Sequence, residues 1–246
     1  MSGHSKWHNI QAKKGKADAA RGKIFTKLGR ELAVAAKGNP NPSTNSKLAD
    51  IIAKAKAANM PNDNIDRCIK KAAGEVGDKD YKELTYEGYG VAGSALIITT
   101  LTDNNNRTAG DVRAIMSKHG GSLGTTGSVS YMFDHKGVIV VERTPNLSED
   151  EITELAIEAG ADDVVTEDDA YEIYTDVPAF SAARKFLEEK GLTFLQAELT
   201  MIPQSKITLT PDKLETFLKM LDKLEENDDV QNVYHNVELP EEEEED

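Results

Sequence analysis

Cysteine is almost absent from this chain, which has one residue of the type, Cys68, among 246. A single cysteine cannot form an internal disulfide, which excludes a disulfide scaffold and a cysteine-rich zinc site and fits a reducing cytosol. Long apolar runs are also missing. The longest aliphatic stretches, 96–98 and 138–141, are far too short to cross a bilayer, and the first residues contain no apolar segment typical of an export signal. We therefore expect a cytoplasmic protein.

Aromatic residues make up only 6% of the chain, but 39% of the residues are hydrophobic and 29% are charged. This composition is typical of a folded protein with a well-solvated surface rather than of a disordered one. The length exceeds that of one ordinary domain, so the sequence favours two or three domains.

Basic residues are scarce over most of the chain, and the net charge is −14. Residues 1–82 nevertheless carry 17 Lys or Arg against 8 Asp or Glu, whereas residues 83–246 carry 12 against 35. Because exposed charges are screened beyond about 8 Å at physiological salt, local charge decides what binds locally. The basic end can bind a polyanion, and the acidic remainder would repel one.

Three helices are predicted in the basic part from apolar residues that recur at helical spacing. They are expected at 23–37, 46–59 and 62–73, after an arm or poorly packed helix that reaches Arg21. The Gly-rich and charge-rich segment 75–81, where the charge balance changes sign, predicts a domain boundary. Residues 1–80 are therefore interpreted as a basic helical nucleic-acid-binding domain.

Beyond this boundary, predicted strands alternate with helices. Strands are expected at 94–102, 128–133, 138–142, 163–166, 171–175, 193–201, 206–209 and 230–237, and helices at 108–118, after the capping box at Ser148, at 178–190 and after Thr210. The order β-α-β-β-α-β over 137–202 is the pattern of a ferredoxin-like domain. The fold class is thus α+β multidomain: an N-terminal three-helix domain followed by two ferredoxin-like domains, one inserted in the other. The split domain covers 83–134 plus 204–239, the inserted domain covers 135–203, and the acidic tail 240–246 is expected to be disordered.

The candidate site is a set of residues near the N-terminus that can neutralise phosphates or stack on bases. The set is Lys6, Trp7, Lys13, Lys14, Lys16, Arg21, Lys23, Lys27 and Arg30. The alternative is an ordinary solvated helix face. Only Asp18 and Glu31 oppose the cations of the first 40 residues, which favours binding. No helix-turn-helix pattern supports base-specific reading.

Other motifs carry weaker signals for a site. A literal G-x-G-x-x-G at Gly88, Gly90 and Gly93 leads into a predicted strand rather than a helix, so a turn is favoured over a dinucleotide site. His4 and His8 lack a third metal ligand nearby. The acidic loop 162–169 could hold a divalent cation for a hydrolase, but a solvated loop is favoured. No catalytic constellation is found, so we expect no enzymatic activity, cofactor or metal.

Several long motifs resemble one known family. They are GHSKWHNIQ, RGKIFTKLGREL, NMPNDNIDRCIKKA, YEGYGVAGSALI, TDNNNRTAGDVR, KHGGSLGTTGSVSYMF and MIPQSK, and together they resemble the YebC/PmpR family of probable transcriptional regulatory proteins over essentially the whole chain. The resemblance implies a helical domain, two nested α/β domains and no enzymatic activity. It also implies a bacterial, cytoplasmic member rather than the related mitochondrial translational activator.

Two functions follow from the charge pattern and the resemblance together. The first is a DNA-binding transcriptional regulator that acts through the basic N-terminal domain. The alternative is a ribosome-associated translation factor that binds ribosomal RNA and relieves stalling, because phosphate contacts do not distinguish DNA from RNA. Neither function predicts a small-molecule substrate or a membrane.

Overall fold

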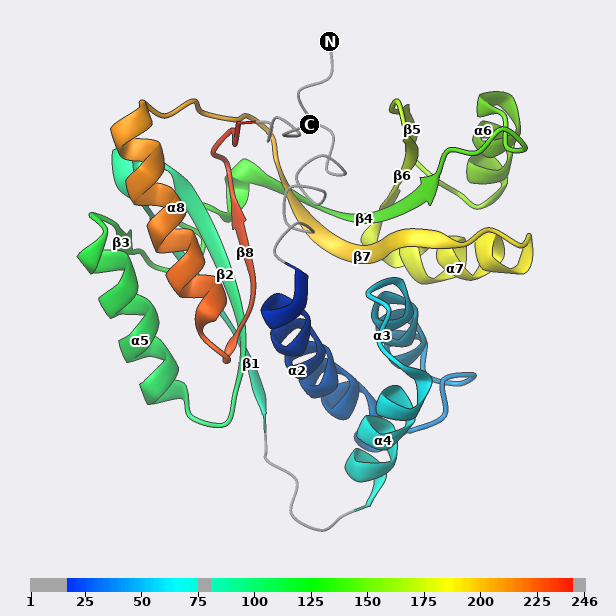
Figure 1. The fold of residues 1–246 in the computed structure, drawn as a ribbon, viewed down its shortest axis with the longest axis horizontal. Coiled ribbons are helices and arrows are strands. Elements are labelled where there is room, and N and C mark those ends of the chain that lie inside the picture. The colour runs from blue at the N-terminus through cyan, green and yellow to red at the C-terminus, as the bar shows by residue number, and fades with distance from the viewer. Residues whose placement is uncertain (1–16, 75–80, 241–246) are drawn as a thin grey trace. The chain divides into compact units, whose positions relative to one another are not determined.

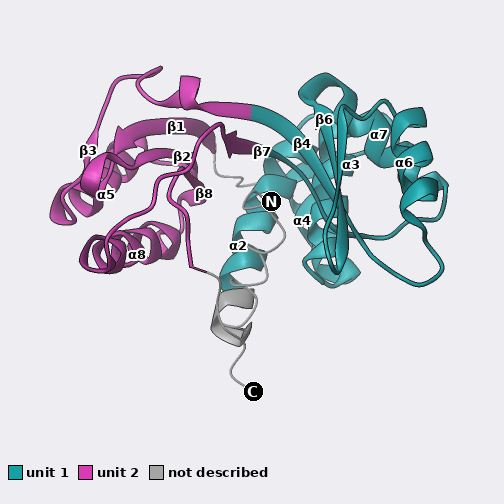
Figure 2. Cartoon of the chain, turned by 90° about the horizontal axis from the view of Figure 1, so that it is seen from above, with its two compact units in different colours: residues 1–75, 135–200, 241–246 teal, residues 76–134, 201–240 magenta. Residues whose placement is uncertain are grey.

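The computed structural model describes residues 17–74 and 81–240, with side chains from residue 22 onward (Figure 1). These residues form two compact units (Figure 2). In unit 1 are residues 17–74 and 135–200, and in unit 2 are residues 81–134 and 201–240. The described part is α+β, with a helical N-terminal part followed by two four-stranded antiparallel sheets, as the sequence predicts.

Unit 1 begins with three helices whose apolar faces meet. They are α2 (Ala17–Ala36), α3 (Ser46–Ala57) and α4 (Asn62–Ala73). Leu32 and Leu48 are fully buried in their shared core, and Ile65 is 3% exposed. The amide oxygen of Asn45 accepts a hydrogen bond from the Leu48 backbone N–H at 3.1 Å and caps the start of α3. The prediction of three helices is confirmed, with α2 starting earlier than expected.

The helices α2 and α4 approach each other closely at Gly29. A Cβ atom on this residue would lie 3.3 Å from the Cys68 Sγ atom of α4. Burial raises the pKa of the Cys68 thiol, and the nearby charges of Arg67 and Lys71 oppose that rise. Cys68 is therefore a packing residue at the α2–α4 contact, with two cations beside it.

The second sheet also belongs mainly to unit 1. Its elements are β4 (Phe133–Glu142), α6 (Glu149–Glu158), β5 (Asp163–Thr166), β6 (Ala170–Asp176), α7 (Val177–Glu189) and β7 (Phe194–Pro203). The strand order is β5-β6-β4-β7, which is the order expected for the β-α-β-β-α-β pattern. Ile139 and Ile173 pair across the sheet and are buried with Phe180 of α7. The Ser148 hydroxyl accepts the Glu151 backbone N–H at 3.2 Å, so the predicted cap of α6 is confirmed.

Polar contacts connect the three helices to the second sheet domain within unit 1. Asp50 of α3 accepts a hydrogen bond from Arg184 Nε of α7 at 2.7 Å and another from the Ser181 hydroxyl. Lys54 of α3 lies 3.4 Å from Glu198 of β7. The division into domains 1–80 and 135–203 stays a prediction, but the described helices and this sheet are in direct contact.

The first sheet belongs to unit 2. Its elements are β1 (Lys82–Tyr89), β2 (Ala95–Thr102), α5 (Asn105–Lys118), β3 (Ser122–Leu123), α8 (Pro211–Glu226) and β8 (Val230–His235), with short 3-10 turns at Val91–Gly93 and Ser130–Met132. The strand order is β3-β1-β2-β8, and α5 and α8 pack on the sheet around a core that includes Leu96, Phe217 and Leu224. Since β4–β7 lie between β3 and α8 in the chain, the second sheet is an insertion in the first.

Strand β1 was not predicted from the sequence. Its residues KELTYEGY contain two glutamates, a lysine and a glycine, which are poor strand formers. The strand forms because it pairs antiparallel with β2 along its whole length, from Lys82 opposite Thr102 to Tyr89 opposite Ala95. Tertiary pairing therefore overrides local propensity here.

The predicted strand 128–133 is wrong, and a buried carboxylate explains why. Glu87 is 6% exposed, and its two oxygens accept backbone N–H groups from Gly127 at 2.8 Å and from Val129 and Ser130 at 2.9 Å. These N–H groups are consequently unavailable for strand pairing. The segment forms a loop and a 3-10 turn, and β1 is paired instead by the two residues of β3.

Replacing Glu87 by glutamine is expected to cost about 1–3 kcal/mol of stability at about pH 7. The glutamine amide is uncharged and has one accepting oxygen, so it cannot accept all three N–H groups as the carboxylate does. Burial alone would raise the pKa of Glu87, but the three N–H bonds outweigh it and hold the pKa below the ordinary 4.5. The charged form thus stabilises the fold above about pH 4.5, and this contribution is lost as the pH falls through the lower folded value. Thermal unfolding of both proteins at about pH 7 and about pH 3 measures the difference, which should shrink at the lower pH. An equal difference at both pH values would contradict this account.

Two smaller expectations near α8 need correction. The predicted strand 206–209 is reduced to a single bridge in which Ile207 pairs with Val237, since prolines at 203 and 211 flank the segment. Thr210 precedes α8 as predicted, but its hydroxyl donates to the Asp212 carboxylate at 2.6 Å instead of accepting a backbone N–H. The start of α8 is therefore set by Pro211 at the first helical position.

Candidate nucleic-acid interface

A row of cations follows one face of α2. Lys23, Lys27 and Arg30 are separated by four and three residues, which places them on one side of a helix with 3.6 residues per turn. The buried Leu28 and Leu32 lie on the opposite side, where they join the helical core. Lys23 is exposed, and Lys27 and Arg30 are partly exposed. The fold of α2 thus separates its apolar and basic faces.

The structure brings together three of the nine candidate residues. Lys6, Trp7, Lys13, Lys14 and Lys16 lie outside the described residues, and Arg21 is described by its backbone in α2 alone. Their role in binding stays a prediction.

Cations on α3 and α4 were not among the candidates. Lys54 of α3 forms ion pairs within the protein, since its Nζ atom lies 3.1 Å from Glu31 and 3.4 Å from Glu198. On α4, Arg67, Lys70 and Lys71 are exposed. Their i, i+3, i+4 spacing is visible in the sequence and is the signal that could have identified them.

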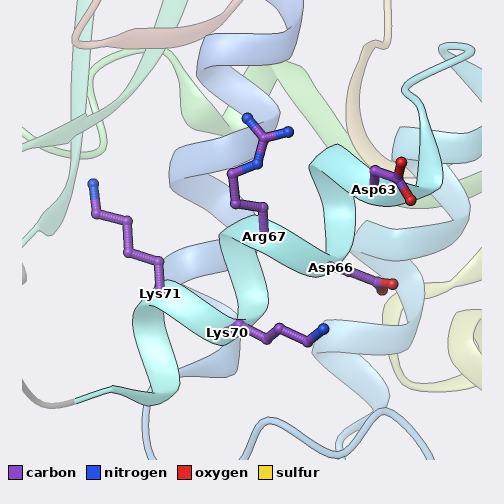
Figure 3. A pocket seen from close by; sticks show the side chains of 5 residues that line it. All are labelled: Asp63, Asp66, Arg67, Lys70 and Lys71. Carbon is purple, nitrogen blue, oxygen red and sulfur yellow. The ribbon is translucent and has the colours of Figure 1, made fainter.

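The α4 cations line a shallow hollow in the surface together with two acidic residues (Figure 3). Asp63 and Asp66 each precede a cation of this set by four residues, a spacing that permits ion pairs along a helix. Within the described part of the chain, however, Arg67, Lys70 and Lys71 form no ion pair. Figure 3 shows Arg67 and Lys71 extending on one side of α4, and Asp66 and Lys70 on the other.

Each glycine of the G-x-G-x-x-G motif stands where the fold requires a glycine. A Cβ atom on Gly88 would lie 2.4 Å from the Ser122 carbonyl oxygen of β3, and one on Gly90 would lie 2.6 Å from the Ser94 hydroxyl. Gly93 has a φ of +78°, in the region that favours glycine. The triplet ends β1 and leads into β2, as expected for a turn.

In the acidic segment 162–169, Asp162 is paired with a lysine side chain, whereas the sequence alone left open a divalent metal ion there. Lys136 lies 2.9 Å from Asp162 and 2.6 Å from Asp176, and hydrogen bonds to both carboxylates raise the pKa of this lysine. Within residues 17–74 and 81–240, no group of three His, Cys, Asp or Glu is placed to hold a metal ion. Every described helix is also too short or too polar to cross a membrane.

Comparison with known proteins identifies relatives over the whole length. Residues 5–75 match the TACO1/YebC protein N-terminal domain, and residues 81–237 match the TACO1/YebC second and third domain. A probable transcriptional regulatory protein from Clostridium tetani is 57% identical over 243 residues, covering 98% of this chain and 99% of the relative. Another protein of that description, from Thermoanaerobacter pseudethanolicus, is 53% identical over 246 residues and covers 100% of both chains.

A solved structure has the same fold. The crystal structure of a conserved hypothetical protein from Aquifex aeolicus is 43% identical, with a TM-score of 0.78, and the match covers 93% of this chain and 95% of that one. The resemblance inferred from the motifs is therefore confirmed. With family matches to both parts and relatives of this identity and coverage, the chain belongs to the TACO1/YebC family of probable transcriptional regulatory proteins.

Proposed function

We propose that this protein is a transcriptional regulator that binds DNA through the basic face of its N-terminal helical part, without enzymatic activity. The observation that carries the proposal is the row of Lys23, Lys27 and Arg30 on the face of α2 opposite its buried leucines. The names of the relatives support a regulatory role.

The distribution of charge along the chain also favours DNA binding at the N-terminal end. Residues 17–74 carry 11 Lys or Arg against 5 Asp or Glu, in a protein whose net charge is −14. Each phosphate contact releases condensed counterions, and this term supplies most of the affinity of sequence-independent DNA binding. Phosphate contacts position a protein on a duplex but do not read its sequence. The proposal therefore concerns affinity, and it assigns no operator sequence.

Reversing the three charges of the α2 row tests the proposal. The variant Lys23→Glu, Lys27→Glu, Arg30→Glu is expected to bind a duplex of about 20 base pairs roughly ten- to a hundredfold more weakly at about 100 mM salt, because three attractive contacts become repulsive. Fluorescence anisotropy of a labelled duplex measures the affinity. Circular dichroism should show unchanged helix content, since these side chains lie outside the core.

A matched control changes the net charge equally in unit 2. Arg113, Lys118 and Lys213 are exposed residues of α5 and α8, and their replacement by glutamate also changes the net charge by six. The control variant should bind nearly as well as the unmodified protein. Equal losses in the two variants would mean that only net charge matters, and the α2 row would no longer be a binding surface.

A further inference from the structure

We propose that Arg67 and Lys71 of α4 form a second phosphate-binding pair, placed beside the α2 row, so that the ligand is an extended nucleic-acid backbone that crosses the α2–α4 contact. The inference rests on the proposed function, in that it assigns further contacts to the same interface. It adds residues outside the arm and α2, and it specifies a polymer with several consecutive phosphates.

The position of the pair follows from the contact between the two helices. Gly29 of α2 meets Cys68 of α4, and the charges of Arg67 and Lys71 lie close enough to act on the Cys68 thiol. Arg30 follows Gly29 in the chain and turns outward from the core, as do Arg67 and Lys71 on α4. Cations from both helices therefore lie along the outer side of the same contact.

The charge arrangement on α4 favours an anion at the pair. Two cations one helical turn apart repel each other and destabilise the helix in the absence of a compensating charge. Asp63 could compensate Arg67 by its spacing, yet these residues form no ion pair within the described part of the chain. Both cations line the surface hollow of Figure 3 together with Lys70, Asp63 and Asp66, so the hollow has three cations against two carboxylates. A phosphodiester would remove the repulsion and add charge-assisted hydrogen bonds.

The distance between Lys23 and the α4 pair indicates that the ligand is a polymer. Lys23 and Gly29 are six residues apart, or about 9 Å along the axis of α2. Duplex DNA carries one charge per roughly 1.7 Å of its axis, so a ligand that touches Lys23 and the α4 pair presents several phosphates over this distance. A single phosphate group cannot contact both.

The test removes the two charges without reversing them. The variant Arg67→Gln, Lys71→Gln is compared with the control Lys47→Gln, Lys56→Gln, which removes two exposed cations of α3 outside the hollow. Affinities are measured over a salt series for a DNA duplex and an RNA duplex of the same sequence. Loss of the pair should weaken binding roughly tenfold and lower the slope of log affinity against log salt by about 2, whereas the control should keep the original slope.

The outcomes separate the inference from the proposed function. If the pair variant keeps the affinity and slope of the unmodified protein while reversal of the α2 row abolishes binding, the α4 pair is overturned and the proposed function stands. If the protein binds RNA alone and the pair variant weakens it, the pair stands and the DNA-binding proposal falls. Equal slope changes in the pair and control variants, or no binding to either duplex, would overturn the pair.

Discussion

Affinity for duplex DNA is expected to fall roughly a thousandfold as the monovalent salt concentration rises from about 50 to about 200 mM, if about six cations contact phosphates. Five of the described residues are proposed for these contacts, namely Lys23, Lys27, Arg30, Arg67 and Lys71, and the lysines of residues 1–16 are further candidates. The physical cause is counterion release, which lowers log affinity in proportion to log salt with a slope near −0.9 per contact. Anisotropy titrations at several salt concentrations give this slope directly.

The control for the salt series is the variant with reversed charges at 23, 27 and 30, whose slope should be shallower by about 3. Thermal unfolding curves at each salt concentration check that the protein is folded under the conditions of the titration. A flat response in the unmodified protein would exclude a phosphate-dominated mechanism, and the basic faces of α2 and α4 would then be ordinary solvated surfaces.

The helices were predictable because their information is local. Apolar residues at helical spacing and a short capping pattern suffice for α3, α4 and α6, and the separate α2 row of cations follows from the same periodicity. The strand β1 and the loop that ends in the Ser130–Met132 turn were not predictable in this way. The strand depends on its pairing with β2, and the loop depends on Glu87, which lies about 40 positions away, so no local pattern reveals either.

The cations of the proposed α4 pair were not among the sequence candidates for a related reason. Along the sequence, Asp63 and Asp66 partly cancel the charges of Arg67, Lys70 and Lys71, so a local charge sum shows little. The folded helix separates these groups by direction, with Arg67 and Lys71 on one side (Figure 3). Side-chain direction, rather than composition, is the signal that identifies the pair.

Replacing Asp50 by alanine is expected to destabilise unit 1 by about 3–5 kcal/mol, because it leaves the charge of Arg184 buried without its main partner. The Arg184 side chain is only 6% exposed, its Nε atom lies 2.7 Å from Asp50 Oδ1, and its other contact is with Glu188 at 2.8 Å, whose side chain is 54% exposed. Asp50 also accepts the Ser181 hydroxyl, so its loss removes two links between α3 and α7. The midpoint of thermal unfolding should fall by roughly 10–20 °C for a unit of this size.

The double variant Asp50→Ala, Arg184→Met separates an unpaired charge from a lost contact. Since methionine fills the space without a charge, the double variant should be more stable than Asp50→Ala alone, which a double-mutant cycle quantifies as a coupling energy. A loss below about 1 kcal/mol in Asp50→Ala would show that Glu188 or water replaces the missing carboxylate. With the expected result, the ion pair fixes the α3 helix, and with it the helical core beneath the basic rows, to the sheet domain at α7. Binding assays on the charge variants then report contacts with the ligand, because their substitutions leave this ion pair intact.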